Sequence, residues 1–339
     1  MDIKKTFLEL TKKLVPYRKE YILLPYLPNG IEMDMVGNYR ITIGKTRTMF
    51  TCHMDSYTDK LIDVVHKITI DSKGEKVATD GKTPLSADCK AGMTVMLNMI
   101  EHNIPGCYYF FLGEEAMDGS GCKGSREIFK NTPEFFTRFD RCIAFDRHGY
   151  DSIISSQRGD VCCSDEFVKE LSKKLLNNRL NYRKDPTGRY TDSAVFMYTI
   201  PEVTNISTGG FNEHTNREFQ NITYLEKLCN ATVNISWEDL PTIRIPVKIE
   251  KPKRKHKAIY NNRKEFHSNK TYGGSGFLGD LENTINGTSL ESKYAKKKRA
   301  EKEYEDYLKS NDYKNKRKRP RIKKYNNFNR KNNNNFENY

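Results

Sequence analysis

Five short segments of the chain carry side chains of the kind that bind divalent metal ions. Zinc accepts imidazole and carboxylate ligands, and paired metal sites commonly share one bridging carboxylate. Two histidines and three carboxylates are about the number of protein ligands that a pair of metals needs. The chain offers His53, Asp88, Glu115, Asp146 and His214, within His53-Met54-Asp55, Ser86-Ala87-Asp88, Gly113-Glu114-Glu115, Phe145-Asp146-Arg147 and Glu213-His214-Thr215.

Two further carboxylates stand beside these candidate ligands. Asp55, two residues after His53, could accept the other N–H of the imidazole, which fixes the tautomer and raises the basicity of the ligand. Glu114 precedes Glu115, and adjacent side chains in a loop can point in different directions. One can then bind metal while the other takes and relays a proton from water that the metal has made acidic. We therefore predict Glu114 and Asp55 as the catalytic residues beside the ligands.

Each segment also has an ordinary structural explanation. A His-x-Asp triplet arises by chance, and Glu-Glu pairs usually lie on solvated faces. Asp88 could cap a helix that begins near Lys90, and a lone histidine such as His214 is more often a surface residue. The combination favours a metal site, because the order of the segments, their glycines and their positions after strands all agree.

The candidate ligands follow short apolar runs that are typical of buried strands. Strands that alternate with helices predict an α/β fold with a mixed, mostly parallel sheet flanked by helices. In open α/β sheets, ligand sites gather at the carboxyl ends of the strands, so we expect the candidates to lie close together. The runs are residues 49–52, 107–112, 142–145 and 203–206, which lead to His53, Glu114-Glu115, Asp146 and Gly209-Gly210.

Hydrophobic spacing and turn residues predict the remaining elements. Residues 20–52 are expected to be strands broken by turns, and residues 65–83 a hairpin with a turn at Asp71-Ser72-Lys73-Gly74. Ser164 precedes one of the helices and is a favourable capping residue. The predicted helices cover residues 4–14, 90–102, 122–131, 164–178 and 221–236.

Charge divides the chain into two unequal parts. Residues 1–243 hold 31 Lys and Arg against 33 Asp and Glu, whereas residues 244–339 hold 27 against 11. We therefore predict a catalytic domain over residues 1–243 and a basic, Lys- and Asn-rich, largely disordered tail over residues 244–339. The run Lys314-Asn315-Lys316-Arg317-Lys318-Arg319-Pro320-Arg321 could bind nucleic acid phosphates, could direct nuclear import, or could have no partner.

The eight cysteines include no CxxC pair and mostly lie in apolar runs, as reduced core residues do. The N-terminus lacks the layout of a secretory signal, and no run approaches the length of a membrane span. These features predict a cytoplasmic, reducing compartment and no membrane partner.

One stretch resembles a known group of enzymes. Residues 80–92, Asp80-Gly81-Lys82-Thr83-Pro84-Leu85-Ser86-Ala87-Asp88-Cys89-Lys90-Ala91-Gly92, resemble the segment around the bridging aspartate in the M20/M28 clan of co-catalytic zinc exopeptidases. Cys89 stands where an acidic residue is frequent in that clan. The resemblance covers roughly residues 40–235. The clan includes tripeptidase T-like enzymes, aminopeptidases and deacylases.

The resemblance implies a role for each candidate residue. His53 and Asp146 would bind one Zn²⁺, Glu115 and His214 the other, and Asp88 would bridge them. Cobalt or manganese could replace zinc in such sites. The resemblance also implies that Asp55 orients His53 and that Glu114 is the general base and acid.

The intervals between these segments imply a compact enzyme. The interval from Asp146 to His214 leaves no room for the lid domain of many M20 members, so a compact, M28-like catalytic domain is expected. The implied activity is hydrolysis of an amide bond near the end of a peptide or aminoacyl substrate, foremost by an aminopeptidase. The alternatives are a carboxypeptidase or amino-acid deacylase of the clan, or a nucleic-acid-associated protein with a retired peptidase domain.

Other residues near these segments carry weaker signals. Thr191-Asp192-Ser193 resembles a turn near the clan's site, although a helix cap explains it equally well. His148 could approach the site from its place after Asp146. Arg147 and Arg158 could meet a substrate carboxylate, although surface placement explains them as well.

Overall fold

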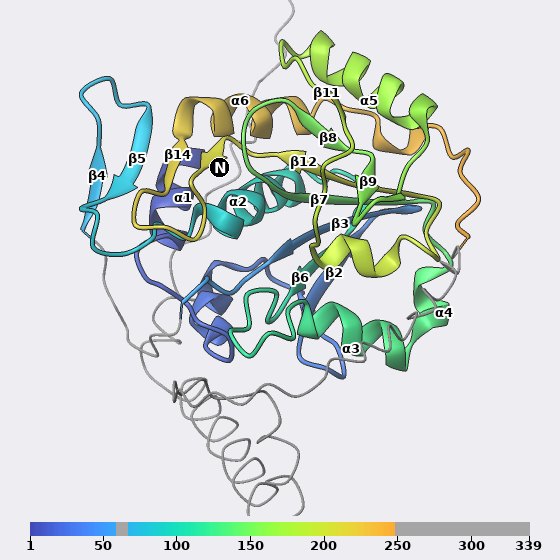
Figure 1. Cartoon of the computed structure of the whole chain (residues 1–339), viewed down its shortest axis with the longest axis horizontal. Helices are drawn as coiled ribbons and strands as arrows, with labels where there is room; N and C mark the ends of the chain where they lie inside the picture. The colour runs from blue at the N-terminus through green and yellow to red at the C-terminus, as the bar shows by residue number, and fades with distance from the viewer. Residues whose placement is uncertain (59–66, 248–339) are drawn as a thin grey trace, which may run out of the picture. The chain divides into compact units, whose positions relative to one another are not determined.

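The structure is a computed structural model that describes residues 1–58 and 67–247. All of these residues fall within the first of two units along the chain, Met1–Tyr272. The second unit, Gly273–Tyr339, contains no described residue. The centre of the described part is an eight-stranded sheet (Figure 1). Its strands, in spatial order, are β1 (Glu32–Met33), β2 (Tyr39–Ile43), β6 (Gly106–Phe111), β3 (Thr48–His53), β7 (Arg141–Arg147), β12 (Glu202–Ser207), β8 (Ser152–Ile154) and β11 (Arg183–Asp185).

The middle of this sheet is parallel and its flanks are mixed. Strands β6, β3, β7 and β12 are neighbours and run in the same direction. Strand β2 is antiparallel to β6, and β8 is antiparallel to β12. The mixed, mostly parallel α/β sheet predicted from the sequence is confirmed. Parallel neighbours end at the same edge, so the residues that follow β6, β3 and β7 come together there.

The central strands are buried on both faces. All six residues of β3 and of β6 are buried. Along β6, Tyr108 and Phe110 pack into one hydrophobic core, while Tyr109 and Phe111 pack into a second core on the opposite face. Successive side chains of a strand point to opposite faces, so an unbroken apolar run serves both cores at once.

Helices cover the two faces of the sheet in separate sets (Figure 1). Helix α2 contacts β3 and β7, and it also contacts α1 and α6. Ser164, predicted as a cap, accepts a hydrogen bond from the backbone N–H of Phe167 at 3.2 Å. The first core draws on α1 (Ile3–Leu10), α2 (Ala87–Glu101), α5 (Asp165–Asn177) and α6 (Ile222–Thr232), and the second on α3 (Lys123–Asn131), α4 (Pro133–Phe136) and η2 (Asp192–Phe196).

The predicted hairpin is confirmed over its described residues. Strands β4 (Ile68–Ile70) and β5 (Lys76–Thr79) pair antiparallel and join β14 (Phe219–Asn221) and β13 (Gly210–Phe211) in a four-stranded sheet. Two short strands, β9 (Ser156–Gln157) and β10 (Asp160–Val161), form a separate pair.

The prediction of strands throughout residues 20–52 is wrong at its beginning. Glu20–Tyr26 forms a 3₁₀ helix, η1, which contains Pro25 and buries Leu23. A strand at this point would lose a ladder hydrogen bond at Pro25, because proline has no N–H. The last predicted helix is also shorter than expected, because α6 ends at Thr232 and a 3₁₀ turn, η3 (Trp237–Asp239), follows.

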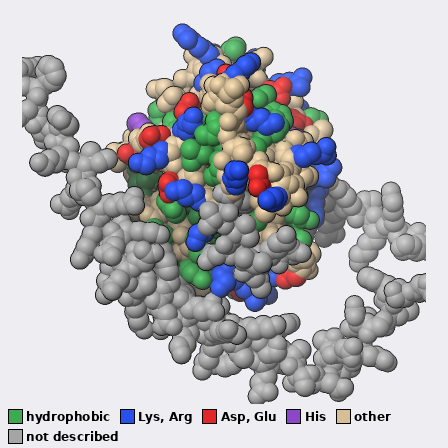
Figure 2. Space-filling view, turned by 90° about the vertical axis from the view of Figure 1, so that its left-hand side faces the viewer, with side chains coloured by type: hydrophobic (Ala, Val, Ile, Leu, Met, Phe, Trp, Pro, Cys, Tyr) green, Lys and Arg blue, Asp and Glu red, His purple; other side chains and the backbone are tan. Residues whose placement is uncertain are grey.

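The predicted tail falls almost wholly outside the described residues. The division at residue 243 therefore stays a prediction. The side chain of Arg244 donates hydrogen bonds to the carbonyl oxygens of Pro201, Met197 and Ile200, so contacts with the body continue at this residue. Basic and acidic side chains are interspersed on the face seen in Figure 2, as the near-neutral balance of residues 1–243 suggests. In the described ranges, no helix is long and apolar enough to cross a membrane.

Candidate metal centre

The five predicted ligands come from five places along the chain and meet at one edge of the central sheet. His53 is the last residue of β3, and Asp146 lies near the end of β7. Asp88 lies in the first turn of α2, where its own φ and ψ are not helical. Glu115 follows β6, and His214 lies between β13 and β14. The prediction that these residues converge is therefore confirmed by their positions, while their metal binding stays a prediction.

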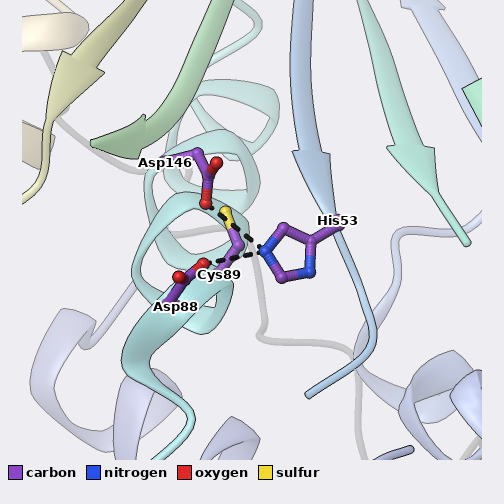
Figure 3. Close-up of side chains that lie close together, drawn as sticks. All are labelled: His53, Asp88, Cys89 and Asp146. Carbon is purple, nitrogen blue, oxygen red and sulfur yellow. Dashed lines mark hydrogen bonds and ion pairs between the residues drawn. The ribbon is translucent and has the colours of Figure 1, made fainter. Parts of the chain in front are cut away.

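His53 is the centre of the first group of side chains (Figure 3). Its Nε2 atom lies 2.8 Å from Oδ1 of Asp88 and 3.3 Å from Oδ1 of Asp146. The Sγ atom of Cys89 also lies in this group, but it points to the carbonyl oxygen of Phe145 at 3.0 Å. The peptide bond between Asp88 and Cys89 is cis.

Asp88 links this first group to a second group. Its Oδ2 atom lies 3.1 Å from Nε2 of His214, and the same nitrogen lies 3.0 Å from Oε1 of Glu115. The His214 ring stacks on the ring of Tyr57, with centroids 4.3 Å apart. One carboxylate therefore faces one imidazole with each of its oxygens, which is the arrangement that a bridging ligand needs.

A glycine allows α2 to approach β7 this closely. A Cβ atom on Gly92 would lie 2.1 Å from the carbonyl oxygen of Phe145 and 2.5 Å from Sγ of Cys89. Any other residue would push the start of the helix away from the strand. Gly92 therefore keeps Asp88 beside Asp146.

Burial and mutual charge shift the pKa values of the first group. Burial alone would lower the pKa of His53, but the charge of Glu114 and the nearby carboxylates of Asp146, Asp55 and Asp88 raise it well above its ordinary value. Burial raises the pKa of Asp146 to about 7, aided by the charge of Asp88. Like charges thus oppose each other in this group, and a positive charge placed among them lowers their repulsion.

The second group shows the same balance. Burial would lower the pKa of His214, but hydrogen bonds with Asp88 and Glu115 raise it to about 11. Burial would raise the pKa of Asp88, but hydrogen bonds with His214 and His53 hold it well below its ordinary range. In both groups a positive charge among the carboxylates lowers the electrostatic energy.

One oxygen of the first group lacks a hydrogen-bond partner. Oδ1 of Asp146 is buried and accepts no well-aligned hydrogen bond in the described part of the chain, where its contact with Nε2 of His53 at 3.3 Å is an ion pair. A buried carboxylate oxygen without a donor is costly, and a cation beside it removes that cost. Together with the imidazole and carboxylate donors around it, this atom fits a divalent metal with nitrogen and oxygen ligands.

Asp55 contacts the His53 imidazole and also has a role that the sequence did not predict. The nearest acceptor for Nδ1 of His53 is the backbone carbonyl oxygen of Asp55 at 3.0 Å, while Oδ1 of Asp55 lies 3.4 Å away. The Asp55 carboxylate also accepts hydrogen bonds from the backbone N–H groups of Glu114 at 3.1 Å and Glu115 at 2.9 Å. These amides point at Asp55 because the chain turns sharply at Gly113, where φ is +67°. Asp55 therefore fixes the turn that carries both glutamates.

Glu114 is held by the segment that the sequence marked only as a helix cap or substrate contact. Its Oε2 atom accepts hydrogen bonds from the Thr191 hydroxyl at 3.2 Å and from the Asp192 backbone N–H at 3.0 Å. Burial, together with the charges of Asp146 and Asp192, raises the pKa of Glu114 well above its ordinary value. A carboxyl group in this environment can hold a proton as well as accept one.

A cavity of about 200 Å³ opens beside the candidate ligands. His148, predicted as an approaching residue, lines it and lies 2.6 Å from Oε1 of Glu213 through Nδ1. Arg147 also lines it and forms an ion pair with Asp185 at 3.3 Å. Arg158 instead lies over the ring of Tyr190, 4.1 Å from its centroid.

Sequence reasoning missed two buried charged residues that support the site. Glu218 accepts hydrogen bonds from the backbone N–H groups of Ser86 at 2.8 Å and Asp88 at 3.2 Å. Lys90 is fully buried and donates to the carbonyl oxygens of Met54 at 2.6 Å and Asp55 at 3.3 Å. Only the place of Lys90, two residues after Asp88, could have drawn attention to it.

No family model and no curated protein sequence matches the chain. Solved structures do match it. A tripeptidase from Staphylococcus aureus has a TM-score of 0.54 and 16% identity, over 68% of this chain and 96% of its own. The TET1 peptidase of Pyrococcus horikoshii has a TM-score of 0.53 and 14% identity, over 70% of this chain and 100% of the peptidase chain. An aminopeptidase from the archaeon Desulfurococcus kamchatkensis has a TM-score of 0.53 and 14% identity, over 72% of this chain and 95% of the aminopeptidase chain.

At these identities the likeness establishes the fold. The described part of the chain therefore has the α/β fold shared by tripeptidase and aminopeptidase structures. This confirms the fold that the sequence resemblance predicts.

Proposed function

We propose that this chain is a metal-dependent hydrolase that cleaves an amide bond near the end of a peptide, foremost an aminopeptidase. The observation that carries the proposal is the position of Asp88, whose two oxygens lie 2.8 Å from the His53 imidazole and 3.1 Å from the His214 imidazole. A carboxylate between two imidazoles, each with a second carboxylate nearby, is the ligand set of a pair of metal ions.

The donors divide naturally between two Zn²⁺ ions. His53 and Asp146 would hold one ion, Glu115 and His214 would hold the other, and Asp88 would bridge them. The unpartnered Oδ1 of Asp146 and the mutual repulsion of the carboxylates support this division. Zinc bound here would act as a Lewis acid on the scissile carbonyl and would lower the pKa of a coordinated water molecule.

Glu114 would move the proton. Its Oε2 atom is fixed by Thr191 and the Asp192 amide, and the residue lines the cavity beside the ligands. Its carboxylate can accept a proton from the attacking water and deliver it to the leaving amine. Burial raises the pKa of Glu114, which favours its protonated form and suits the role of acid in the second step.

The choice of aminopeptidase rests on the charge of the cavity wall and on the matched structures. Glu213 lines the cavity beyond the proposed ligand set, and its carboxylate, which also contacts His148 at 2.6 Å, would attract the ammonium group of a peptide N-terminus. The Staphylococcus and Desulfurococcus structures are named as a tripeptidase and an aminopeptidase. Arg147 on the same wall is the observation that favours a carboxypeptidase or deacylase instead.

The eight free cysteines of the described part fit the predicted reducing, cytosol-like compartment.

The experiment combines metal analysis with a substitution of Glu114. Full-length protein loaded with zinc should hold the metal through gel filtration and release N-terminal residues from a peptide library. Glu114→Gln should keep the metal and lose at least about a hundredfold in kcat, the lower end of what a general base contributes. Glu127→Gln, on the exposed face of α3, is the matched control and should leave kcat unchanged.

Three outcomes separate the alternatives. Shortening from the C-terminus would identify a carboxypeptidase. Absence of zinc and of cleavage would identify a retired peptidase domain. Hydrolysis by Glu114→Gln at the wild-type rate, with zinc still bound, would refute the proposed mechanism.

A further inference from the structure

Beside the proposed metal pair lies a second group of potential ligands that the proposed reaction does not use as ligands. Three residues, Glu114, Cys122 and Asp192, each offer one ligand atom, and these three atoms all lie within 4.8 Å of one another. We propose that these residues form a third cation site, which takes a thiophilic divalent ion such as Zn²⁺ or Cd²⁺ and inhibits the enzyme by occupying Glu114.

The backbone fixes the three residues relative to one another. The N–H of Cys122 donates to the carbonyl oxygen of Glu114 at 3.1 Å. The N–H of Asp192 donates to Oε2 of Glu114 at 3.0 Å. The three side chains therefore start from positions held by hydrogen bonds between segments, and little chain entropy is lost when they bind an ion.

An unpartnered carboxylate oxygen points to a ligand at this place. Asp192 is 1% exposed. Its Oδ1 accepts a hydrogen bond from the Ser125 hydroxyl, whereas its buried Oδ2 receives none in the described part of the chain. Native proteins leave few buried polar atoms without a partner, and a bound cation would satisfy this one.

The donor set selects the kind of ion. One thiol and two carboxylates suit Zn²⁺ or Cd²⁺, while Mg²⁺ and Ca²⁺ prefer sites made of oxygen alone. Cys122 is 2% exposed, and burial with the charges of Glu114 and Asp192 raises the pKa of its thiol. A cation reverses that effect: as the sulfur–metal bond forms, the S–H proton leaves to solvent, so binding releases one proton. The ion can enter through the cavity, because Glu114 lines it.

Binding at this site would block the proposed chemistry. An ion on the Glu114 carboxylate occupies the lone pairs that must accept a proton from water. Zinc would then activate the protein when it fills the pair and inhibit it when in excess. This inhibitory consequence rests on the proposed function, whereas the existence of the third site does not.

A cadmium titration tests the site without reference to hydrolysis. Full-length protein stripped by a chelator is titrated with Cd²⁺, and both bound metal and the ultraviolet thiolate-to-cadmium charge-transfer band are measured. Wild-type protein should bind one equivalent more than Cys122→Ala and should show a band that this variant lacks. Cys229→Ala, which removes another buried cysteine in α6, should keep both.

Two results would overturn the third site. One is equal cadmium binding by wild type and Cys122→Ala. The other is a band that survives in Cys122→Ala, which would assign the sulfur to Cys89 in the first group. If Cys122→Ala does not fold, Cys122→Ser replaces only the sulfur and gives the same comparison.

A zinc titration of activity tests the inhibition. Excess Zn²⁺ should inhibit wild-type hydrolysis, and Cys122→Ala should need at least about tenfold more zinc for half-inhibition, with each rate normalised to its own maximum. Equal inhibition of both proteins would overturn the inhibitory role. A chain that cleaves no peptide but still shows the Cys122-dependent cadmium band would refute the proposed function and leave the third site standing.

Discussion

Asp55 offers a quantitative test of how the active-site turn is held. Its fully buried carboxylate accepts the backbone N–H groups of Glu114 and Glu115 at 3.1 and 2.9 Å. In Asp55→Asn the amide oxygen can keep one of these bonds, while the NH₂ group must face the other N–H. The change therefore removes one hydrogen bond to a carboxylate, about 1.5–3 kcal/mol, and leaves a buried donor unpaired.

This loss falls on the turn that carries the proposed base and a proposed ligand. If the turn shifts, the lost hydrogen-bond energy raises the activation free energy of hydrolysis. Each 1.36 kcal/mol added to this barrier slows the reaction about tenfold. We expect kcat/KM for an aminoacyl reporter to fall about tenfold to about a hundredfold in zinc-loaded Asp55→Asn. The urea midpoint should also fall.

Asp34→Asn is the matched control for this test. Oδ1 of Asp34 also accepts backbone N–H groups, those of Val36 and Gly37 at 2.8 and 2.9 Å, but it lies in the turn between β1 and β2. It should lower stability and leave kcat/KM within about twofold of wild type. An Asp55→Asn enzyme with wild-type kcat/KM would show that this carboxylate does not position the turn.

Three further predictions concern metal, pH and the tail. Zinc at a hundredfold excess over its dissociation constant should stabilise the fold by about 2.7 kcal/mol for each site that it fills, seen as a rise in Tm that a chelator reverses. Asp146→Asn should reduce that rise, and an equal rise in the variant would argue against this ligand. Glu20 is 2% exposed, and burial with the charge of Asp55 raises its pKa from 4.5 to about 8. Folded protein thus holds this proton more tightly than unfolded protein does, so its stability falls as pH rises from about 4.5 to about 8. Glu20→Gln should therefore gain urea stability relative to wild type between about pH 5 and about pH 8, and a pH-independent difference would contradict the assignment. Deletion of residues 248–339 should abolish salt-sensitive retention on immobilised DNA or RNA, and unchanged retention would disprove a role for the tail.

The sequence alone singled out the candidate ligands and predicted the edge of the sheet where they meet. His53 and Asp146 each complete an apolar strand, and Glu115 follows another. Parallel strands end together, so local patterns were enough to predict that these three residues converge. The five candidate ligands and the mixed α/β sheet follow from such patterns. The 3₁₀ helix at Glu20–Tyr26 does not, because its apolar residues fit a strand equally well.

Only the tertiary structure decided which atoms face each other. The two oxygens of Asp88 reach His53 and His214 because Gly92 lets α2 lie against β7. Asp55 binds the amides of the Glu114 turn more closely than the imidazole it was expected to orient, and Asp192 holds Glu114 from a distant segment. Types and order of residues are local properties that a sequence records. Pairs of atoms are set by the approach of segments far apart in the chain, which depends on the packing of the whole core.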